Sequence, residues 1–399
     1  MALPLRAAKI ERRAQALPLW SMDSALKEAA SSLRAQPCPL SRKLYEALQR
    51  AWYYLLSDLT QNHPLHPTTI MQKLTFVDLF CGGGFGARGA VRGGGVPLLG
   101  LDAWGLATKT YKANFPDASI LTERIEKVDT VELARRYTPD VLLTSPECTA
   151  HSIARGAKPG QEKSRETAIG IVPWIASMKP RWVIVENVNR MKQWDRHDEL
   201  LKTIKTAGYS VSSLYLNSAD FGSAQARKRM FLICDRLGAT VTRDDLLIFS
   251  KAPKLTANDI IDWQSGFKSA KLHQPGRAKA TLERAARAIK RLGRNVPFII
   301  VYYGSDYAGG WQPLDVPLRT VTTIDRFGLV TWVKGVPHLR MLQPSELLKA
   351  MGGGSEHRLP YGSRREKVKL CGNGVCSDVM TAIFQWIGKQ HKSVKKAYG

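Results

Sequence analysis

The chain has few cysteines, no long apolar run and a shortage of acidic residues, and each deficit argues against a class of protein. Six cysteines among 399 residues are too few for a disulfide framework, so the thiols are expected to be reduced. None stands in a Cys-x-x-Cys pair with a matching partner pair, so no metal site is expected. No apolar run approaches the roughly 18 residues of a membrane span, and the first residues lack the apolar region of a secretory signal. We therefore expect a cytoplasmic protein without membrane association.

The shortage of acids leaves the chain strongly basic. The 59 Lys and Arg residues outnumber 34 Asp and Glu residues, which gives a net charge of +25. A field of this sign attracts polyanions, and nucleic acid is the commonest such partner; a generally basic soluble protein is the alternative. Nine basic residues fall between residues 268 and 294, where Glu283 is the only acid. This run fits either a nucleic-acid contact or a solvated helix face.

From residue 73 onward, short apolar runs alternate with helix-like segments. Such an alternation predicts an α/β fold, a doubly wound and mostly parallel sheet with helices on both faces. Two later runs, joined by a short polar connection, predict an antiparallel strand pair at the sheet edge. The predicted strands cover residues 74–80, 96–101, 140–144, 182–185, 209–216 and 229–234, and helices are predicted at 108–114 and 130–137.

Changes in composition divide the chain into four segments. Residues 1–71 have helix-like apolar spacing before a proline-containing linker and read as an N-terminal helical extension. Residues 72–235 carry the α/β alternation. Residues 236–345 break that rhythm and predict a separate, smaller domain. Residues 346–399 return to a helical pattern and are expected to rejoin the first α/β segment.

A glycine-rich segment, Asp78-Leu-Phe-Cys-Gly-Gly-Gly-Phe-Gly86, follows the first strand and precedes a helix-like stretch. Glycines let a backbone turn tightly and approach a ligand closely. Asp102 ends the next strand, where a carboxylate accepts hydrogen bonds from ribose hydroxyls, and Phe80 and Trp104 are candidates for stacking on a ring. The loop lacks the GxGxxG register and a GK[ST] ending, so a nucleotide other than a dinucleotide or a nucleoside triphosphate is favoured.

Polar residues also follow three other strands. Cys148 lies in the loop after residues 140–144 and is a candidate nucleophile, although a lone cysteine is more often a small buried thiol. Glu186 ends the strand that begins at residue 182. Arg227 and Arg229 precede the last strand and alternate onto one side of the chain, where a solvated charge cluster is the alternative.

The order of these motifs resembles the C5-cytosine-specific DNA methyltransferases. The resemblance covers about residues 73 to 385 and is weak from 235 to 318. The matching segments are Asp78–Gly84, Pro146–Cys148, Glu186–Val188, Gln225–Arg229 and Gly372–Val375.

The resemblance implies an AdoMet-dependent, Rossmann-like catalytic domain and a target-recognition domain over residues 236–345. It implies methyl transfer from S-adenosyl-L-methionine to cytosine C5 in double-stranded DNA, by a monomer that flips the base out of the helix, as in restriction-modification systems of bacteria or phages. Cys148 would attack C6 of the base, and Glu186 would hold N3 and N4. Arg229, with Arg227, would hold O2, and Arg165 would assist. Residues implied at the cofactor are Asp78, Phe80, Gly82, Gly84, Asp102, Trp104, Glu123, Pro146, Asn373 and Val375.

Several residues around the nucleophile depart from the family pattern. Glu147 stands where proline is usual, Thr149 where glutamine is usual, and His151 where phenylalanine is common. A carboxylate beside Cys148 raises a thiol pKa and lowers the thiolate fraction, which a protonated His151 would offset. Glycine at position 374 replaces a common serine.

Three alternatives remain open. An amino-group methyltransferase acting on adenine N6 or cytosine N4 would carry an aromatic residue in the motif that begins at Ser145, where this chain has Cys148. A catalytically inactive DNA-binding homologue is favoured by Glu147. A tRNA cytosine-C5 methyltransferase is the third alternative.

Overall fold

The computed structural model describes residues 74–146, 168–189, 191, 196–250, 253–304 and 309–398. The chain falls into two compact units, Met1–Gln72 and Lys73–Gly399. The first unit lies outside the described residues, and with it the predicted helical extension. None of the described helices is long and apolar enough to cross a membrane.

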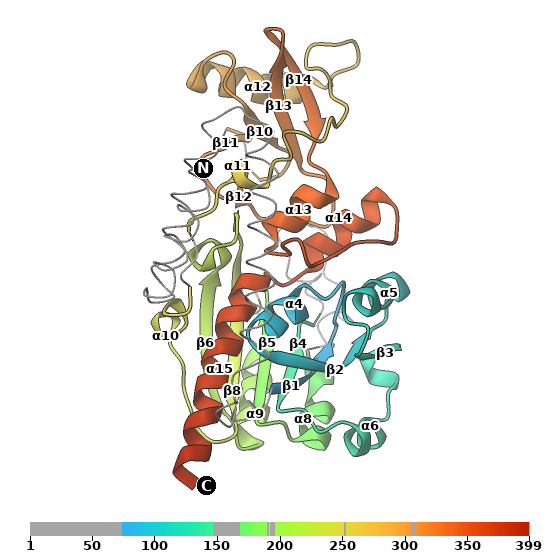
Figure 1. The fold of residues 1–399 in the computed structure, drawn as a ribbon, viewed down its shortest axis with the longest axis vertical. Helices are drawn as coiled ribbons and strands as arrows, with labels where there is room; N and C mark the ends of the chain where they lie inside the picture. Colours follow the sequence, from blue (N-terminus) through green and yellow to red (C-terminus); the bar gives the residue numbers. More distant parts are fainter. Residues whose placement is uncertain are drawn as a thin grey trace, which may run out of the picture. The chain divides into compact units, whose positions relative to one another are not determined.

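A seven-stranded sheet in the order β3-β2-β1-β4-β5-β8-β6 forms the centre of the second unit (Figure 1). The strands from β3 to β5 in this order pair in parallel, and β8 pairs antiparallel with both β5 and β6. The predicted strands therefore form, including the antiparallel pair at the edge. Their bounds are β1 (Leu74–Leu79), β2 (Gly95–Asp102), β3 (Ser119–Thr122), β4 (Val141–Thr144), β5 (Trp182–Asn187), β6 (Ser210–Asn217) and β8 (Lys228–Asp235).

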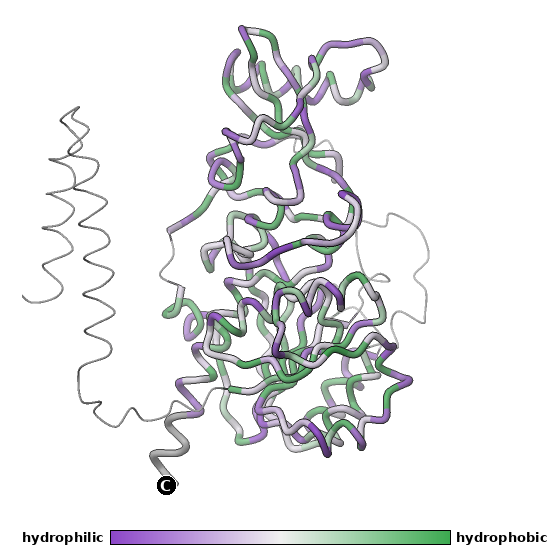
Figure 2. Tube along the Cα trace, turned by 45° about the vertical axis from the view of Figure 1, so that its right-hand side comes forward, coloured by the Kyte–Doolittle hydropathy of each residue, from purple (hydrophilic) through white to green (hydrophobic). Residues whose placement is uncertain are grey.

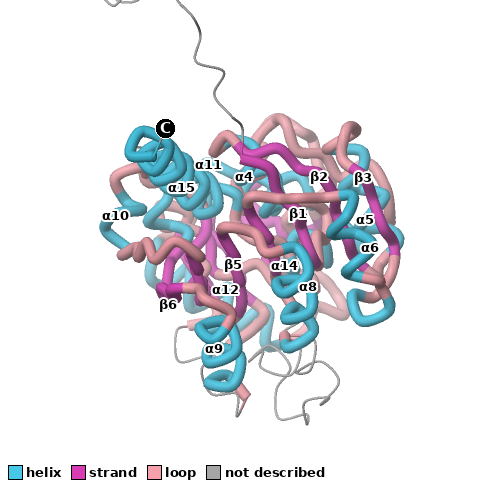
Figure 3. The backbone as a smooth tube through the Cα atoms, turned by 90° about the horizontal axis from the view of Figure 1, so that it is seen from below, coloured by secondary structure: helices cyan, strands magenta, loops and turns pink. Residues whose placement is uncertain are grey.

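Helices cover both faces of this sheet, because its central strands are apolar on both sides. Along β1, Phe76 belongs to one buried cluster with residues of α4, α5 and α15, whereas Val77 belongs to another with residues of α8 and α9. Figure 3 shows α4 and α15 on one side of the strands and α8 and α9 on the other, and in Figure 2 hydrophobic colour follows the strands. The predicted doubly wound α/β fold is confirmed. The helices are α4 (Phe85–Arg92), α5 (Gly105–Asn114), α6 (Thr130–Arg136), α8 (Val172–Met178), α9 (His197–Thr206) and α15 (Ser377–Tyr398), with short 3-10 turns η1 (Ile125–Lys127), η3 (Ile169–Ile171) and η5 (Ser218–Phe221).

Helix α15 packs closely on α4 although nearly 300 residues separate them. A Cβ atom at Gly89 would lie 2.1 Å from the carbonyl oxygen of Ser377, and one at Gly93 would lie 2.4 Å from the Phe384 side chain. Phe384 also meets Phe76 edge to face, with ring centroids 5.4 Å apart. Helix α15 is therefore part of the same α/β layer as α4.

A second, five-stranded sheet in the order β11-β10-β13-β14-β9 is covered by α12 (Lys279–Leu292). Two further strands, β7 (Gln225–Ala226) and β12 (Leu318–Arg319), pair in parallel. This pairing connects the part of the chain that holds the second sheet to the segment just before β8. The remaining elements are β9 (Ala270–Lys271), β10 (Phe298–Val301), β11 (Trp311–Pro313), β13 (Phe327–Val333), β14 (Val336–Met341), α10 (Arg243–Leu247), α11 (Ala257–Ile260), α13 (Pro344–Ala350) and α14 (Arg364–Asn373).

Candidate active site

Three neighbouring parallel strands, β1, β4 and β5, end at one edge of the large sheet and bring the predicted motifs together. Ser145 follows β4, and its hydroxyl donates to the carbonyl oxygen of Phe80 after β1 at 3.2 Å. On the other side, the Asn187 amide at the end of β5 donates to the carbonyl oxygen of Pro146 at 3.2 Å. Ser145 and Pro146 are thus held between the glycine loop (residues 78–86) and the end of β5, which carries Glu186. Cys148 and Arg165 lie outside the described residues.

The glycine loop contains the backbone conformations that its sequence predicts. Gly82 (φ 51°) and Gly84 (φ 85°) are in the left-handed region, as is Phe80 (φ 56°), a conformation that costs a bulky residue about 1–3 kcal/mol and often marks functional sites. A Cβ at Gly82 would meet nothing within 4 Å, whereas one at Gly84 would lie 2.6 Å from the Phe115 ring. Gly82 therefore leaves open space, and Gly84 serves packing beneath the loop.

Two carboxylates, the buried Asp78 and the half-buried Asp102, stand beside this loop. Asp102 accepts from the backbone N–H of Gly82 at 2.9 Å through one oxygen, and from that of Trp104 at 2.8 Å through the other. Burial raises the pKa of Asp102 against the effect of these hydrogen bonds. Burial, and then the charge of Asp102, raise the pKa of Asp78 well above its usual value, while the Tyr111 hydroxyl lowers it. The Lys369 ammonium lies 4.3 Å from the centre of the Trp104 ring.

Glu123 is half-buried after β3 and faces its own turn. Its carboxylate accepts from the backbone N–H of Arg124 at 2.8 Å and lies 4.0 Å from the Lys127 ammonium. The structure gives no contact between Glu123 and the Asp102 side chain. Glu123 thus stays a prediction at the cofactor site, supported by its place after β3, next to β2 in the sheet.

Glu186 is a buried acid with an unused acceptor. Its side chain is 8% exposed, and Oε1 lies 3.3 Å from Nε of Arg229. The geometry is that of an ion pair and not of a hydrogen bond, so Oε1 has no hydrogen-bond donor among the described residues. Burial raises the pKa of Glu186, and Arg229 and then Arg227 oppose that rise. A buried carboxylate oxygen without a hydrogen-bond donor is costly, which makes Glu186 a candidate for binding a ligand.

Arg227 is held differently from Arg229. It is 4% exposed, and its guanidinium donates to the carbonyl oxygens of Val321 and Gly372, at 3.0 Å each. Gln225 contacts the same segment, because its side-chain carbonyl oxygen accepts a hydrogen bond from the backbone N–H of Val321 at 2.7 Å. The side chains of Gln225 and Arg227 thus connect the segment just before β8 to the backbone of residues far along the chain. The charge of Arg227 reaches Glu186, and the two guanidinium hydrogen bonds given above are made to backbone carbonyl groups.

The last motif approaches the glycine loop from α14. Asn373 is exposed at the end of that helix. Val375 is buried, and its Cβ lies 3.5 Å from where a Cβ on Gly86 would be. A Cβ at Gly374 would lie 2.8 Å from the Phe85 ring. The motif therefore packs directly behind the helix that starts at the glycine loop.

Sequence reasoning missed a loop beneath the glycine loop. His357 is buried, its ring centroid lies 4.5 Å from that of Phe85, and it meets the backbone of Gly83. Burial, and then the nearby cations Arg88 and Arg92, lower the pKa of His357 to about 3. Arg92 also donates to the carbonyl oxygen of Gly352 at 2.5 Å. No sequence signal marks this histidine, because its partners are more than 260 residues away.

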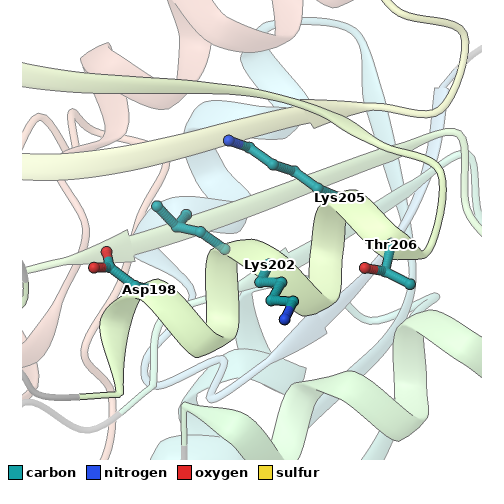
Figure 4. Close-up of a pocket in the computed structure, with 5 residues that line it drawn as sticks. Asp198, Lys202, Lys205 and Thr206 are labelled. Atoms are coloured by element: carbon teal, nitrogen blue, oxygen red, sulfur yellow. The ribbon is translucent and has the colours of Figure 1, made fainter.

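One surface hollow lies away from these residues. It is lined along α9 by Asp198, Leu201, Lys202, Lys205 and Thr206 (Figure 4). Its polar side chains are exposed and of mixed charge, Leu201 is half-buried, and none of the five belongs to the predicted motifs. We assign it no part in the site.

The chain belongs to the C-5 cytosine-specific DNA methylase family, whose profile matches residues 74–389. It is 28% identical over 169 residues to the type II methyltransferase M.HgiDI of Herpetosiphon aurantiacus, covering 41% of this chain and 52% of that protein. It is also 28% identical over 171 residues to the tRNA (cytosine(38)-C(5))-methyltransferase of Homo sapiens, covering 41% and 42%. The matched part thus spans about half the length of these relatives. The family uses S-adenosyl-L-methionine as methyl donor.

Solved structures share the fold at low sequence identity. The S. pombe Dnmt2 methyltransferase superimposes with a TM-score of 0.60 at 13% identity, covering 81% of this chain and 99% of that one. A putative prophage-encoded DNA modification methyltransferase of E. coli gives a TM-score of 0.56 at 15% identity, covering 80% and 99%. These likenesses extend the α/β fold assignment over most of the chain.

Proposed function

We propose that this protein transfers a methyl group from S-adenosyl-L-methionine to C5 of cytosine in double-stranded DNA. The observation that carries the proposal is the junction at the sheet edge. Hydrogen bonds from Ser145 and Asn187 hold the start of the Cys148 loop between the glycine loop and the buried Glu186. One edge therefore joins a cofactor cradle to a base-binding acid, in a chain with a net charge of +25.

The residues at the glycine loop fit the cofactor. Gly82 presents open space where any other residue would place a side chain, and the Asp102 carboxylate beside it keeps acceptor capacity for ribose hydroxyls. Trp104 and Phe80 offer ring faces, and Asp78 offers a buried acidic group toward a cationic ligand. When bound, the cofactor supplies an electrophilic methyl group.

The protein's own groups would activate the base. Cytosine C5 is a poor nucleophile, and bonding of the Cys148 sulfur to C6 makes C5 electron-rich. Glu186, whose pKa is raised by burial, would hold a proton toward N3 and accept from N4. Arg229 beside it would hold O2. After C5 has accepted the methyl group, loss of the C5 proton lets the thiolate leave and restores the aromatic ring.

A tRNA substrate is the second candidate, and a specific observation favours it. One curated relative is a tRNA (cytosine(38)-C(5))-methyltransferase. The segment over residues 236–345, which we propose as the target-recognition domain, supports DNA. It supplies a separate sheet covered by the basic helix α12, and such a lobe has the area for groove and phosphate contacts. We further propose that the protein acts as a monomer.

The decisive experiment traps the covalent intermediate. Wild-type protein is incubated with cofactor and a duplex carrying 5-fluorocytosine at sites found by bisulfite sequencing of DNA from expressing cells. A denaturant-stable adduct is expected, because fluorine blocks the release of the thiol. Cys148→Ser should give no adduct and no new C5 methylation while still binding DNA.

The same assay with tRNA distinguishes the two candidates. Adduct formation on tRNA and not on duplex DNA would replace the proposed substrate. Methylation by Cys148→Ser at the wild-type rate would overturn the mechanism. Binding of duplex without any methylation by the wild type would favour the inactive DNA-binding homologue.

A further inference from the structure

Helix α12 covers one face of the five-stranded sheet. Its buried residues Thr281, Ala285 and Ala288 recur every three or four positions, and the last two pack with Phe298 of β10 in one cluster. The next residue of β10, Ile299, faces the opposite side and belongs to the cluster shared with the seven-stranded sheet. Alternation along β10 therefore places α12 on the face turned away from that shared core. Figure 1 shows the helix beside β10 and β11.

The outer face of α12 is purely basic from Arg287 to the end of the helix, whereas in the first turns the Lys279 ammonium lies 4.0 Å from the Glu283 carboxylate. Its exposed residues follow spacings of three and four, so they share one side of the helix, and Glu283 is the only acid in the helix. Arg287 also donates to the carbonyl oxygen of Gly309 at 3.1 Å. The α12 stripe, as we call it, consists of Arg287, Lys290 and Arg291 with Arg294 just beyond the helix, all exposed.

A solvated helix face with paired charges accounts for the first half of α12, where Glu283 stands four residues from both Lys279 and Arg287, but it does not account for the second half, which contains no acid. Exposed helices usually mix signs, because like charges three or four residues apart each cost about 0.2–0.5 kcal/mol. Arg287 forms such pairs with Lys290 and with Arg291. The helix dipole favours cations in the last turn, which accounts for Lys290 and Arg291 but not for Arg287. A stripe with this local cost is better explained by a polyanion that offsets it.

The chemistry of the stripe selects among polyanionic partners. Recognition of single-stranded RNA relies on aromatic side chains that stack on bases, and α12 contains none. A helix bound to a membrane surface buries its apolar face in lipid, but the apolar face of α12 is occupied by the sheet. A row of long cationic side chains fits the phosphates of a duplex.

We propose that the α12 stripe binds the phosphate backbone of double-stranded DNA away from the methylated base and anchors the enzyme there. The proposal rests on DNA being the substrate, as proposed above. Contacts to phosphates position a protein without reading sequence. The stripe therefore contributes affinity and salt dependence, whereas the chemistry at Glu186 proceeds at its own rate.

The test neutralises the stripe and a matched surface. Lys290→Gln, Arg291→Gln and Arg294→Gln are combined in one variant, since glutamine keeps helix propensity. The control combines Lys202→Gln and Lys205→Gln, exposed on α9 next to Asp198 (Figure 4). Fluorescence anisotropy measures binding of a labelled duplex, without cofactor, at several salt concentrations.

The magnitude of the negative slope of log Kobs against log salt concentration should decrease by about 2 to 3 in the stripe variant. The reason is that each substitution removes roughly one cation that pairs with a phosphate. Affinity should fall on the order of tenfold, KM for DNA should rise, and kcat should stay within about twofold. The control should match the wild type. An unchanged slope in the stripe variant would overturn the proposal, as would weakened binding of tRNA alone.

A measurement on the unaltered chain guards against misfolding of the variant. Hydrogen exchange of wild-type protein should slow in α12 when duplex is added, and absence of such protection would also count against the stripe. Because binding is measured without cofactor, the two proposals fail separately. Salt-dependent duplex binding through the stripe without C5 methylation would sink the enzymatic function alone.

Discussion

Glu186 holds a carboxyl group where its charge is disfavoured. Burial raises its pKa and Arg229 only partly opposes this, so the folded protein binds a proton on Glu186 at higher pH than the unfolded chain does. That linkage costs stability as the pH rises through the raised pKa. In the proposed mechanism this cost is offset in function, because Glu186 would hold a proton toward the pyrimidine ring.

Replacing Glu186 by glutamine separates these two effects. Glu186→Gln should lower kcat by about 10²- to 10⁴-fold, the range for a lost general acid or base, with cofactor affinity measured by calorimetry unchanged. At pH 8 the free energy of unfolding should not fall, because a buried charge has been removed. Glu132→Gln, an exposed change on α6, is the control. Full activity in Glu186→Gln would remove this residue from the mechanism.

His357 changes the stability with pH in the opposite direction from Glu186. Its pKa of about 3 means that the unfolded chain binds a proton that the folded protein refuses. Stability is therefore complete above about pH 6.5 and is lost as the pH falls, by up to about 1.4 kcal/mol per pH unit from this group. His357→Phe keeps the ring against Phe85 and should flatten that acid limb. Urea unfolding between pH 4 and pH 7 measures the effect, and an equally steep limb in the variant would contradict it.

At the scale of elements, the contact between α4 and α15 depends on glycine. A Cβ at Gly89 would come within 2.1 Å of the Ser377 carbonyl oxygen, which is backbone and cannot rotate away. Overpacking of this kind costs about 1–3 kcal/mol and sometimes more. Gly89→Ala should therefore lower the free energy of unfolding by at least about 2 kcal/mol, despite its better helix propensity.

Gly105 is the matched control. It also stands in a helix, but its added Cβ would meet nothing closer than 3.8 Å, so alanine there should be neutral or stabilising by about 0.5–1 kcal/mol. Thermal and urea unfolding of both variants measure the difference. Equal stability of the two variants would mean that the two helices separate without cost.

At the scale of the whole molecule, the sequence predicted what is local and missed what is distant. The strands and the glycine loop were predictable because each is written in a short run, such as residues 74–84. The pairing of β7 with β12 was not, since a two-residue strand has no periodicity. His357 escaped notice for the same reason, because its role depends on residues joined only by folding. Arg227 was predicted as a partner of Arg229, and only the structure shows its backbone acceptors.

The position of α15 has a consequence for synthesis. A nascent chain that has just completed the glycine loop still lacks the helix that covers α4, and that helix leaves the ribosome nearly 300 residues later. Until then the hydrophobic surface that α15 covers stays exposed to solvent, to proteases and to other nascent chains. The proposed cofactor site should accordingly form completely only once α15 has emerged, so premature termination anywhere upstream of α15 should abolish the proposed activity.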